Sequence, residues 1–232
     1  MMLPIAQSEI DEYTSHPGNI PNFHNFETPQ LEPGDNGGFS LEIQNRYINN
    51  ITNVSINAEI YHRADIDESE ELDKINSAKR PTITENCWNY NGEEENCTDS
   101  PSSKNANFNI GLMLINQTVQ LKFDIITNED TEEGTYFVRF SMNYELNETE
   151  RILQSRGFWN MEQWTEATTN LSEDYPGNIN LDSLNVDGII PDSSFGIKKP
   201  IPKWPLYVLI TLTIVFAGLS VIFYLEEEET YP

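Results

Sequence analysis

Residues 134–144 read GTYFVRFSMNY, and every second residue from Tyr136 to Tyr144 is apolar. Because the side chains of a β-strand alternate between the two faces of a sheet, this period of two predicts a strand with one buried face. The same alternation recurs over residues 39–43, 52–61, 108–114 and 119–125. No helical pattern separates these segments, and turn-forming residues lie between them. We therefore predict a mainly β fold, an antiparallel β-sandwich.

The turns and strands around these segments resemble a known family. LEPGD at 31–35 followed by FSLEIQN at 39–45 is similar to the opening of archaeal S-layer-associated, immunoglobulin-like repeats (NEW3 type), in which a Pro-Gly turn precedes a strand that ends in Asn. VQLKFDI at 119–125 and TEEGTYFVRF at 131–140 look like the closing hairpin of that family. The likeness covers residues 28–146 and implies an immunoglobulin-like domain of an archaeal cell envelope.

Residues 65–105 depart from the compact repeat of that family. They begin with an acidic run, DIDESEELDKI at 65–75, and continue into the polar stretch CWNYNGEEENC. We expect an acidic insertion with little regular structure. The two cysteines of the chain, Cys87 and Cys97, lie ten residues apart in it and can close a local disulfide loop. A disulfide persists in an oxidising compartment.

The acidic run also holds the best candidates for a metal site. Asp65, Asp67 and Glu70 offer the hard oxygen ligands that Ca²⁺ prefers. Their spacing fits no EF-hand, and a solvated run of charges is the competing interpretation. The sequence has no Gly-x-Ser-x-Gly elbow, and no histidine after His62 could complete a copper site near the last strand. We expect no catalytic residues and no cofactor.

Residues 151–203 differ in character from the predicted strands. Asn160 and Gln163 can cap a short helix, whose apolar face would comprise Met161, Trp164, Ala167 and Leu171. Repeated Gly and Pro residues follow, up to Pro205. We expect a short helix that folds back on the sandwich at 9–150, and then a stiff, Pro-rich juxtamembrane stalk.

Residues 206–225 read LYVLITLTIVFAGLSVIFYL, twenty residues without a charge. As a helix they would span about 30 Å, the thickness of a bilayer's hydrocarbon core. Trp204 and Tyr224 mark the two borders, as the aromatic residues of a membrane interface do. The sequence predicts a transmembrane helix at 204–225 and an acidic tail at 226–232.

The orientation of the predicted span rests on opposing signals. Lys198, Lys199 and Lys203 precede it, and the positive-inside rule alone would place the N-terminal domain in the cytoplasm. Long domains, however, translocate largely regardless of flanking charge, and a disulfide favours the outside. Residues 1–8, MMLPIAQS, resemble the end of a signal peptide with a small-residue cleavage site.

Six N-x-S/T sequons also precede the span and offer candidate glycosylation sites. They lie at Asn50, Asn53, Asn96, Asn116, Asn147 and Asn170. We predict a single-pass glycoprotein of the plasma membrane with an extracellular N-terminal domain. A tail-anchored protein with a cytosolic domain is the alternative.

The charge balance limits the partners of this chain. It has 38 acidic and 13 basic residues, a formal net charge of −25. Such a chain repels the phosphates of nucleic acids. We predict a non-enzymatic cell-surface protein that serves envelope structure or protein binding, with the membrane and other envelope or membrane proteins as partners. The alternative is an accessory subunit of a larger membrane complex, whose helix would pack through the small residues Ala217, Gly218 and Ser220.

Overall fold

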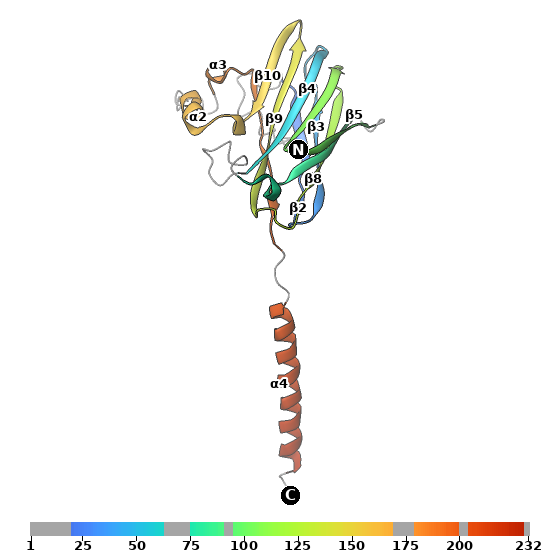
Figure 1. Ribbon diagram of the computed structural model, residues 1–232, viewed down its shortest axis with the longest axis vertical. Helices are drawn as coiled ribbons and strands as arrows, with labels where there is room; N and C mark the ends of the chain where they lie inside the picture. Colours follow the sequence, from blue (N-terminus) through green and yellow to red (C-terminus); the bar gives the residue numbers. More distant parts are fainter. Residues whose placement is uncertain (1–19, 63–74, 91–94, 169–178, 200–203, 230–232) are drawn as a thin grey trace, which may run out of the picture. The chain divides into compact units, whose positions relative to one another are not determined.

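The computed structural model describes residues 20–62, 75–90, 95–168, 179–199 and 204–229. The chain divides into two units, 1–198 and 199–232, and the first contains two β-sheets (Figure 1). One sheet has the antiparallel order β1-β3-β8-β5-β6. Its strands are β1 (Asn22–Glu27), β3 (Asn36–Gln44), β8 (Thr118–Ile126), β5 (Thr82–Tyr90) and β6 (Asn96–Ser103).

The second sheet is built around the long strand β9. On one side β9 pairs with β4, which pairs in turn with β7, and on the other side with β10 and β12. β11 and β2 extend this sheet by parallel pairing with β10 and β12. The bounds are β2 (Gln30–Leu31), β4 (Ile51–His62), β7 (Asn105–Met113), β9 (Gly134–Leu146), β10 (Thr149–Ser155), β11 (Gly188–Ile190) and β12 (Ser193–Ile197).

The two sheets share one hydrophobic core. The alternating residues of β9, from Tyr136 to Tyr144, are buried, as are their counterparts in β3, β4 and β8. Phe140 lies about 6 Å from the rings of Phe26 and Phe39, and Phe39 stacks on Phe123 with 4.6 Å between ring centroids. The chain crosses between the sheets after β1, β2, β3, β4, β6, β7 and β8. The predicted immunoglobulin-like sandwich is therefore confirmed at the level of the fold.

The expected alternation over 108–114 is wrong in its second half. Met113 is buried, whereas Leu112 and Leu114 are exposed. The β4–β7 pairing shifts register at this point, next to Gly111 with a φ of +79° and Asn53 with a φ of +52°. Such an irregularity turns the following side chains to the opposite face.

The expectation of little regular structure over 65–105 is also wrong in part. Residues 63–74 and 91–94 lie outside the described residues, but β5 and β6 occupy 82–90 and 96–103. A short 3-10 helix, η2 (Ser77–Lys79), precedes them. The outward residues of this stretch are polar, and its apolar residues do not alternate regularly, so the sequence pattern does not reveal β5. The inner residues of that strand, such as Ile83, are buried.

The predicted short helix is present, and the predicted stalk begins too early. Of the predicted apolar face, Ala167 is buried and Trp164 partly buried, Met161 is exposed, and Leu171 lies outside the described residues. A 3-10 turn, η3 (Arg156–Phe158), leads to α2 (Met161–Thr168), which starts with the predicted capping pair. The Gln163 N–H donates to Asn160 Oδ1 (2.9 Å), and the Asn160 N–H donates to Gln163 Oε1 (3.1 Å). Trp159 and Ala167 pack with α3 (Leu181–Leu184) in a second, smaller core. Residues 188–197, expected in the stalk, form β11 and β12 of the sandwich.

In the second unit, the described residues from 204 on form the helix α4 (Trp204–Glu229). Side chains are described for its residues 204–220, all of which are exposed. Among the residues that the structure describes, no helix satisfies both the length and the apolarity that a membrane crossing requires.

Candidate functional site

Three connections meet at one end of the sandwich, which we call the loop end. They are residues 45–50 between β3 and β4, 114–117 between β7 and β8, and 147–148 between β9 and β10. Strand pairing brings them together, because Gln44 is opposite Thr118, Ile51 is opposite Met113 and Thr52 is opposite Glu145. The chain leaves the sandwich at the other end, where Ile197 is opposite Gly134.

Asn45 holds the loop end together from inside. Its side chain is fully buried, and its Nδ2 donates to the carbonyl oxygens of Asn49 (3.1 Å), Met113 (3.2 Å) and Leu114 (3.1 Å). Its Oδ1 accepts from the Tyr47 N–H at 3.0 Å. A buried carbonyl without a donor is costly, so one carboxamide here satisfies groups from two loops at once.

Two further contacts join the loops at their surfaces. The Ile115 N–H donates to Asn50 Oδ1 (3.1 Å), and Asn49 Nδ2 donates to Asn147 Oδ1 (3.2 Å). These bonds connect all three loops into one hydrogen-bonded surface.

Beneath this surface, the hydroxyls of Tyr47 and Tyr144 are hydrogen-bonded at 2.8 Å. Burial raises the pKa of the Tyr144 phenol, and its bond to Tyr47 raises it further. Burial also raises the pKa of Tyr47, despite the bond to Tyr144, which lowers it. Both phenols are therefore neutral at physiological pH.

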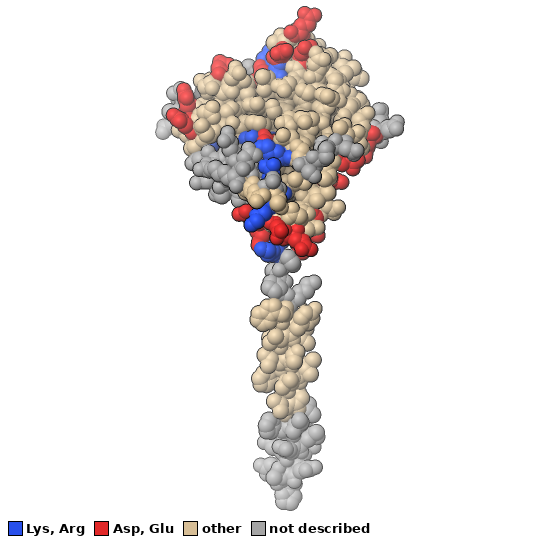
Figure 2. Space-filling view, in the orientation of Figure 1, with Lys and Arg blue, Asp and Glu red and all other residues tan. Residues whose placement is uncertain are grey.

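The outer surface of the loop end carries three exposed aliphatic side chains, next to exposed amides and the charged residues Arg46 and Glu148. Ile48 is 86% exposed, and Leu114 and Ile115 are 47% and 49% exposed. On the face shown in Figure 2, the charged side chains gather in patches and residues of other types cover most of the sandwich. The loop end therefore presents amides, aliphatic side chains and two exposed charges, a combination that suits surface recognition better than catalysis.

Five of the six sequons fall on described residues, and all five are exposed. Asn50, Asn116 and Asn147 lie in the three loops of the loop end, and Asn53 lies close by, at the irregular start of β4. Asn96 begins β6, and Asn170 lies outside the described residues.

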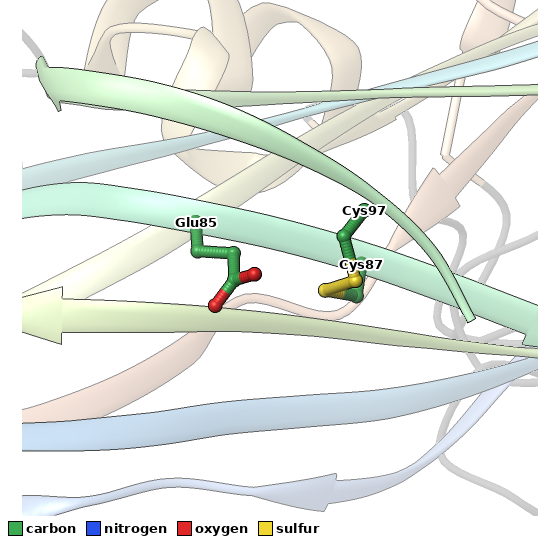
Figure 3. Close-up of side chains that lie close together, drawn as sticks. All are labelled: Glu85, Cys87 and Cys97. Atoms are coloured by element: carbon green, nitrogen blue, oxygen red, sulfur yellow. A yellow bond between two sulfur atoms is a disulfide. The ribbon is translucent and has the colours of Figure 1, made fainter.

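The predicted disulfide between Cys87 and Cys97 is present. The two residues are directly opposite in the β5–β6 pair, with their Cα atoms 4.1 Å apart. Glu85 Oε lies within 4.8 Å of both sulfurs (Figure 3). Because the sulfurs are bonded to each other, they are not thiolates and cannot serve as metal ligands. The calcium candidates Asp65 and Asp67, together with Glu70, lie outside the described residues.

A buried ion cluster on the second sheet escaped the sequence-based predictions. Glu59, 8% exposed, accepts from Arg139 Nε (2.8 Å) and pairs with Lys104 Nζ (2.9 Å). Arg139 also donates to the Gly157 carbonyl (2.9 Å) and lies over the Phe158 ring at 4.4 Å. Through Arg139, the cluster holds η3 against the second sheet. The smaller core begins directly after η3, at Trp159. In the sequence, Glu59 and Arg139 appear only as single charges at outward positions of β4 and β9, and Lys104 as a charge between β6 and β7.

The sequence did point to Asn45, because the resemblance to the immunoglobulin-like repeats includes a strand that ends in Asn, here residues 39–45. The pattern did not reveal that this side chain is buried and bonds to the 113–114 segment, almost seventy residues away.

Comparisons with known proteins give no family. No family model matches the chain, and no curated protein matches it. Solved structures with a similar fold include AvmM, which catalyses macrocyclization in alchivemycin A biosynthesis (TM-score 0.37, 12% identity, 80% of this chain and 92% of that chain). Another is the seventh ScaB type I cohesin from Pseudobacteroides cellulosolvens (TM-score 0.37, 11% identity, 76% and 92%).

A family 123 glycoside hydrolase from Clostridium perfringens is also similar (TM-score 0.32, 11% identity, 74% of this chain). This chain spans only 22% of the length of that hydrolase. At such TM-scores these likenesses carry no argument about function, and the fold assignment rests on the strand pairing described above.

Proposed function

We propose that this chain is a non-enzymatic, single-pass membrane protein whose immunoglobulin-like sandwich lies outside the cell and serves envelope structure or protein binding. The observation that carries the proposal is the apolar surface of α4.

The described part of α4 exposes apolar side chains on every side of the helix. They include Leu206, Val208, Leu209, Ile210, Leu212, Ile214, Val215, Phe216 and Leu219. Apolar surface left in water costs about 25 cal/mol per Å², so a helix of this kind needs an apolar environment. The uncharged run continues to Leu225, beyond the last side chain that the structure describes. Over 206–225 its length matches a lipid bilayer, which we propose as that environment.

The disulfide supports an extracellular position for the sandwich. Cys87 and Cys97 are joined, and disulfides persist in oxidising compartments. The lysines before the helix favour the opposite orientation, but flanking charge has little influence on a long domain.

The loop end supports a role in contact rather than in catalysis. It combines exposed aliphatic, amide and charged side chains, on a base held together by the buried hydrogen bonds of Asn45. An association with an archaeal S-layer remains a prediction from the sequence resemblance.

Truncation tests the anchor. We expect deletion of residues 204–232 to release a soluble, folded sandwich from native membranes. Deletion of only the acidic tail, 226–232, is the matched control and should leave the protein in the membrane pellet after high-salt and alkaline washes. A protein that lacks residues 204–232 but still resists these washes would disprove the anchor.

A further inference from the structure

We propose that the loop end carries N-linked glycans on Asn50, Asn116 and Asn147, so that one end of the sandwich is covered by sugar. The inference rests on the proposed function, because a sequon acquires its glycan on the outer side of a membrane. It goes beyond that function by assigning the modified residues and the surface they cover.

The three asparagines come from separate parts of the chain and meet on one surface. The Asn116 N–H donates to the Asn45 carbonyl (3.0 Å), which fixes the 114–117 loop against the 45–50 loop. The bond from Asn49 to Asn147 joins the third loop to them. All three sequon asparagines are exposed on connections between strands, where a modifying enzyme can reach a side chain.

The orientation of Asn50 suits glycosylation at its nitrogen. Its Oδ1 faces the Ile115 N–H, and only an oxygen can accept from that donor, so Nδ2 takes the other side of the amide. In the transfer reaction, Nδ2 forms a bond to the anomeric carbon of a sugar carried on a lipid phosphate. The bond between that carbon and the phosphate oxygen breaks, the lipid phosphate leaves and Nδ2 loses one proton. Oδ1 remains a carbonyl oxygen and keeps its hydrogen bond.

Turn geometry accounts for the asparagines but not for the residues two positions later. Asn116 and Asn147 have φ values of +58° and +52°, a conformation that Asn adopts readily. Nothing in that geometry requires a hydroxyl at Thr118 or Thr149. Within the described part of the chain, neither hydroxyl takes part in a hydrogen bond. Each of these threonines completes a sequon.

The exposed aliphatic residues of the loop end give the glycans a structural role. Ile48, Leu114 and Ile115 belong to the same loops as the three asparagines. Glycans attached beside them would shield these apolar side chains, which would otherwise favour association between molecules. The opposite end, around Gly134 and Ile197, carries none of the described sequons.

Glycopeptide mass spectrometry of the full-length protein, purified from native membranes, tests the proposal. We expect sugar masses on the peptides that contain Asn50, Asn116 and Asn147. The variants Thr118→Ala and Thr149→Ala should each remove one glycan, seen as one step of increased gel mobility. Asn143→Gln, at an exposed asparagine outside every sequon, is the matched control and should leave the mobility unchanged.

A second measurement separates failure of this inference from failure of the proposed function. A cysteine placed at the exposed Asp130, far from the sequons in sequence, reports whether the sandwich lies outside the cell. If an impermeant maleimide labels Asp130→Cys on intact cells while all three asparagines are unmodified, the glycan proposal is wrong and the extracellular domain stands. If Asp130→Cys is protected and the asparagines are unmodified, both fail.

Discussion

Replacement of Asn45 by alanine is the sharpest test of the loop end. The change removes four hydrogen bonds of a fully buried side chain. It leaves the Met113 and Leu114 carbonyls and the Tyr47 N–H without these partners. A typical hydrogen bond contributes about 0.5–1.5 kcal/mol net, and an orphaned buried group costs about 1–3 kcal/mol. Because Nδ2 shares its protons among three acceptors, we expect a total loss of about 3 kcal/mol in the free energy of unfolding.

Urea denaturation of the chain ending at Lys203, followed by tryptophan fluorescence, measures this loss. With a slope of about 2 kcal/mol per M, the midpoint should fall by roughly 1.5 M. Asn49→Ala is the matched control, because Asn49 lies in the same loop and is exposed, with one side-chain bond at the surface. It should cost less than about 0.5 kcal/mol. An equal loss for the two variants would refute the role assigned to Asn45.

Three other variants test contacts within the sandwich. Arg139→Met should cost about 3 kcal/mol by thermal or urea unfolding, because it removes a close partner of the buried Glu59 carboxylate. Joint replacement of Cys87 and Cys97 by alanine should cost on the order of 2–3 kcal/mol by the same measurement, the entropy of closing a loop of about 11 residues. Tyr144→Phe should cost about 1 kcal/mol at neutral pH through the lost Tyr47 bond, and should make stability fall less steeply above about pH 10.

The alkaline behaviour follows from the direction of the pKa shift. Burial raises the pKa of the Tyr144 phenol, so the folded state favours the neutral form. That preference is fully present below the pKa of an unfolded tyrosine, about 10, and is lost as the pH rises above it. Tyr136 has a pKa raised by burial as well, so Tyr144→Phe reduces the alkaline loss without abolishing it. An unchanged pH profile in Tyr144→Phe would contradict this account.

Controls separate these interior effects from general damage. Arg46→Met changes an exposed arginine and should cost less than about 0.5 kcal/mol, in contrast to Arg139→Met. Reduction of the native protein should destabilise it about as much as the double cysteine replacement does. If reduction has no effect on unfolding, the disulfide does not stabilise the sandwich.

The strands with a clean period of two could be predicted because burial of one face imposes that period. Phe39 to Ile43 and Tyr136 to Tyr144 are examples in which the apolar residues point into the shared core. The pattern failed where the backbone departs from regular pairing. At Gly111 the register shifts and sends Leu114 to the surface, and no local sequence rule locates such a shift.

Strands that depend on distant partners were not predictable. β5 mixes buried Asn86 with buried Ile83, because Asn86 Nδ2 donates to the Asn107 carbonyl across the sandwich. β12 is a strand because Gly134–Val138 of β9 and Gln30–Leu31 of β2 lie beside it. For the site, the sequence supplied the sequons and Asn45 separately. Their gathering at one end follows from strand pairing, which the local pattern does not contain.

Site-specific labelling of intact cells tests the central claim most directly. Since Cys87 and Cys97 are joined, single cysteines introduced at Asp130 and Tyr231 are the reactive ones. An impermeant maleimide should label Asp130→Cys on intact cells and Tyr231→Cys only after the membrane is opened. Labelling of Tyr231→Cys alone on intact cells would place the sandwich inside and contradict the proposal of a membrane-anchored surface protein.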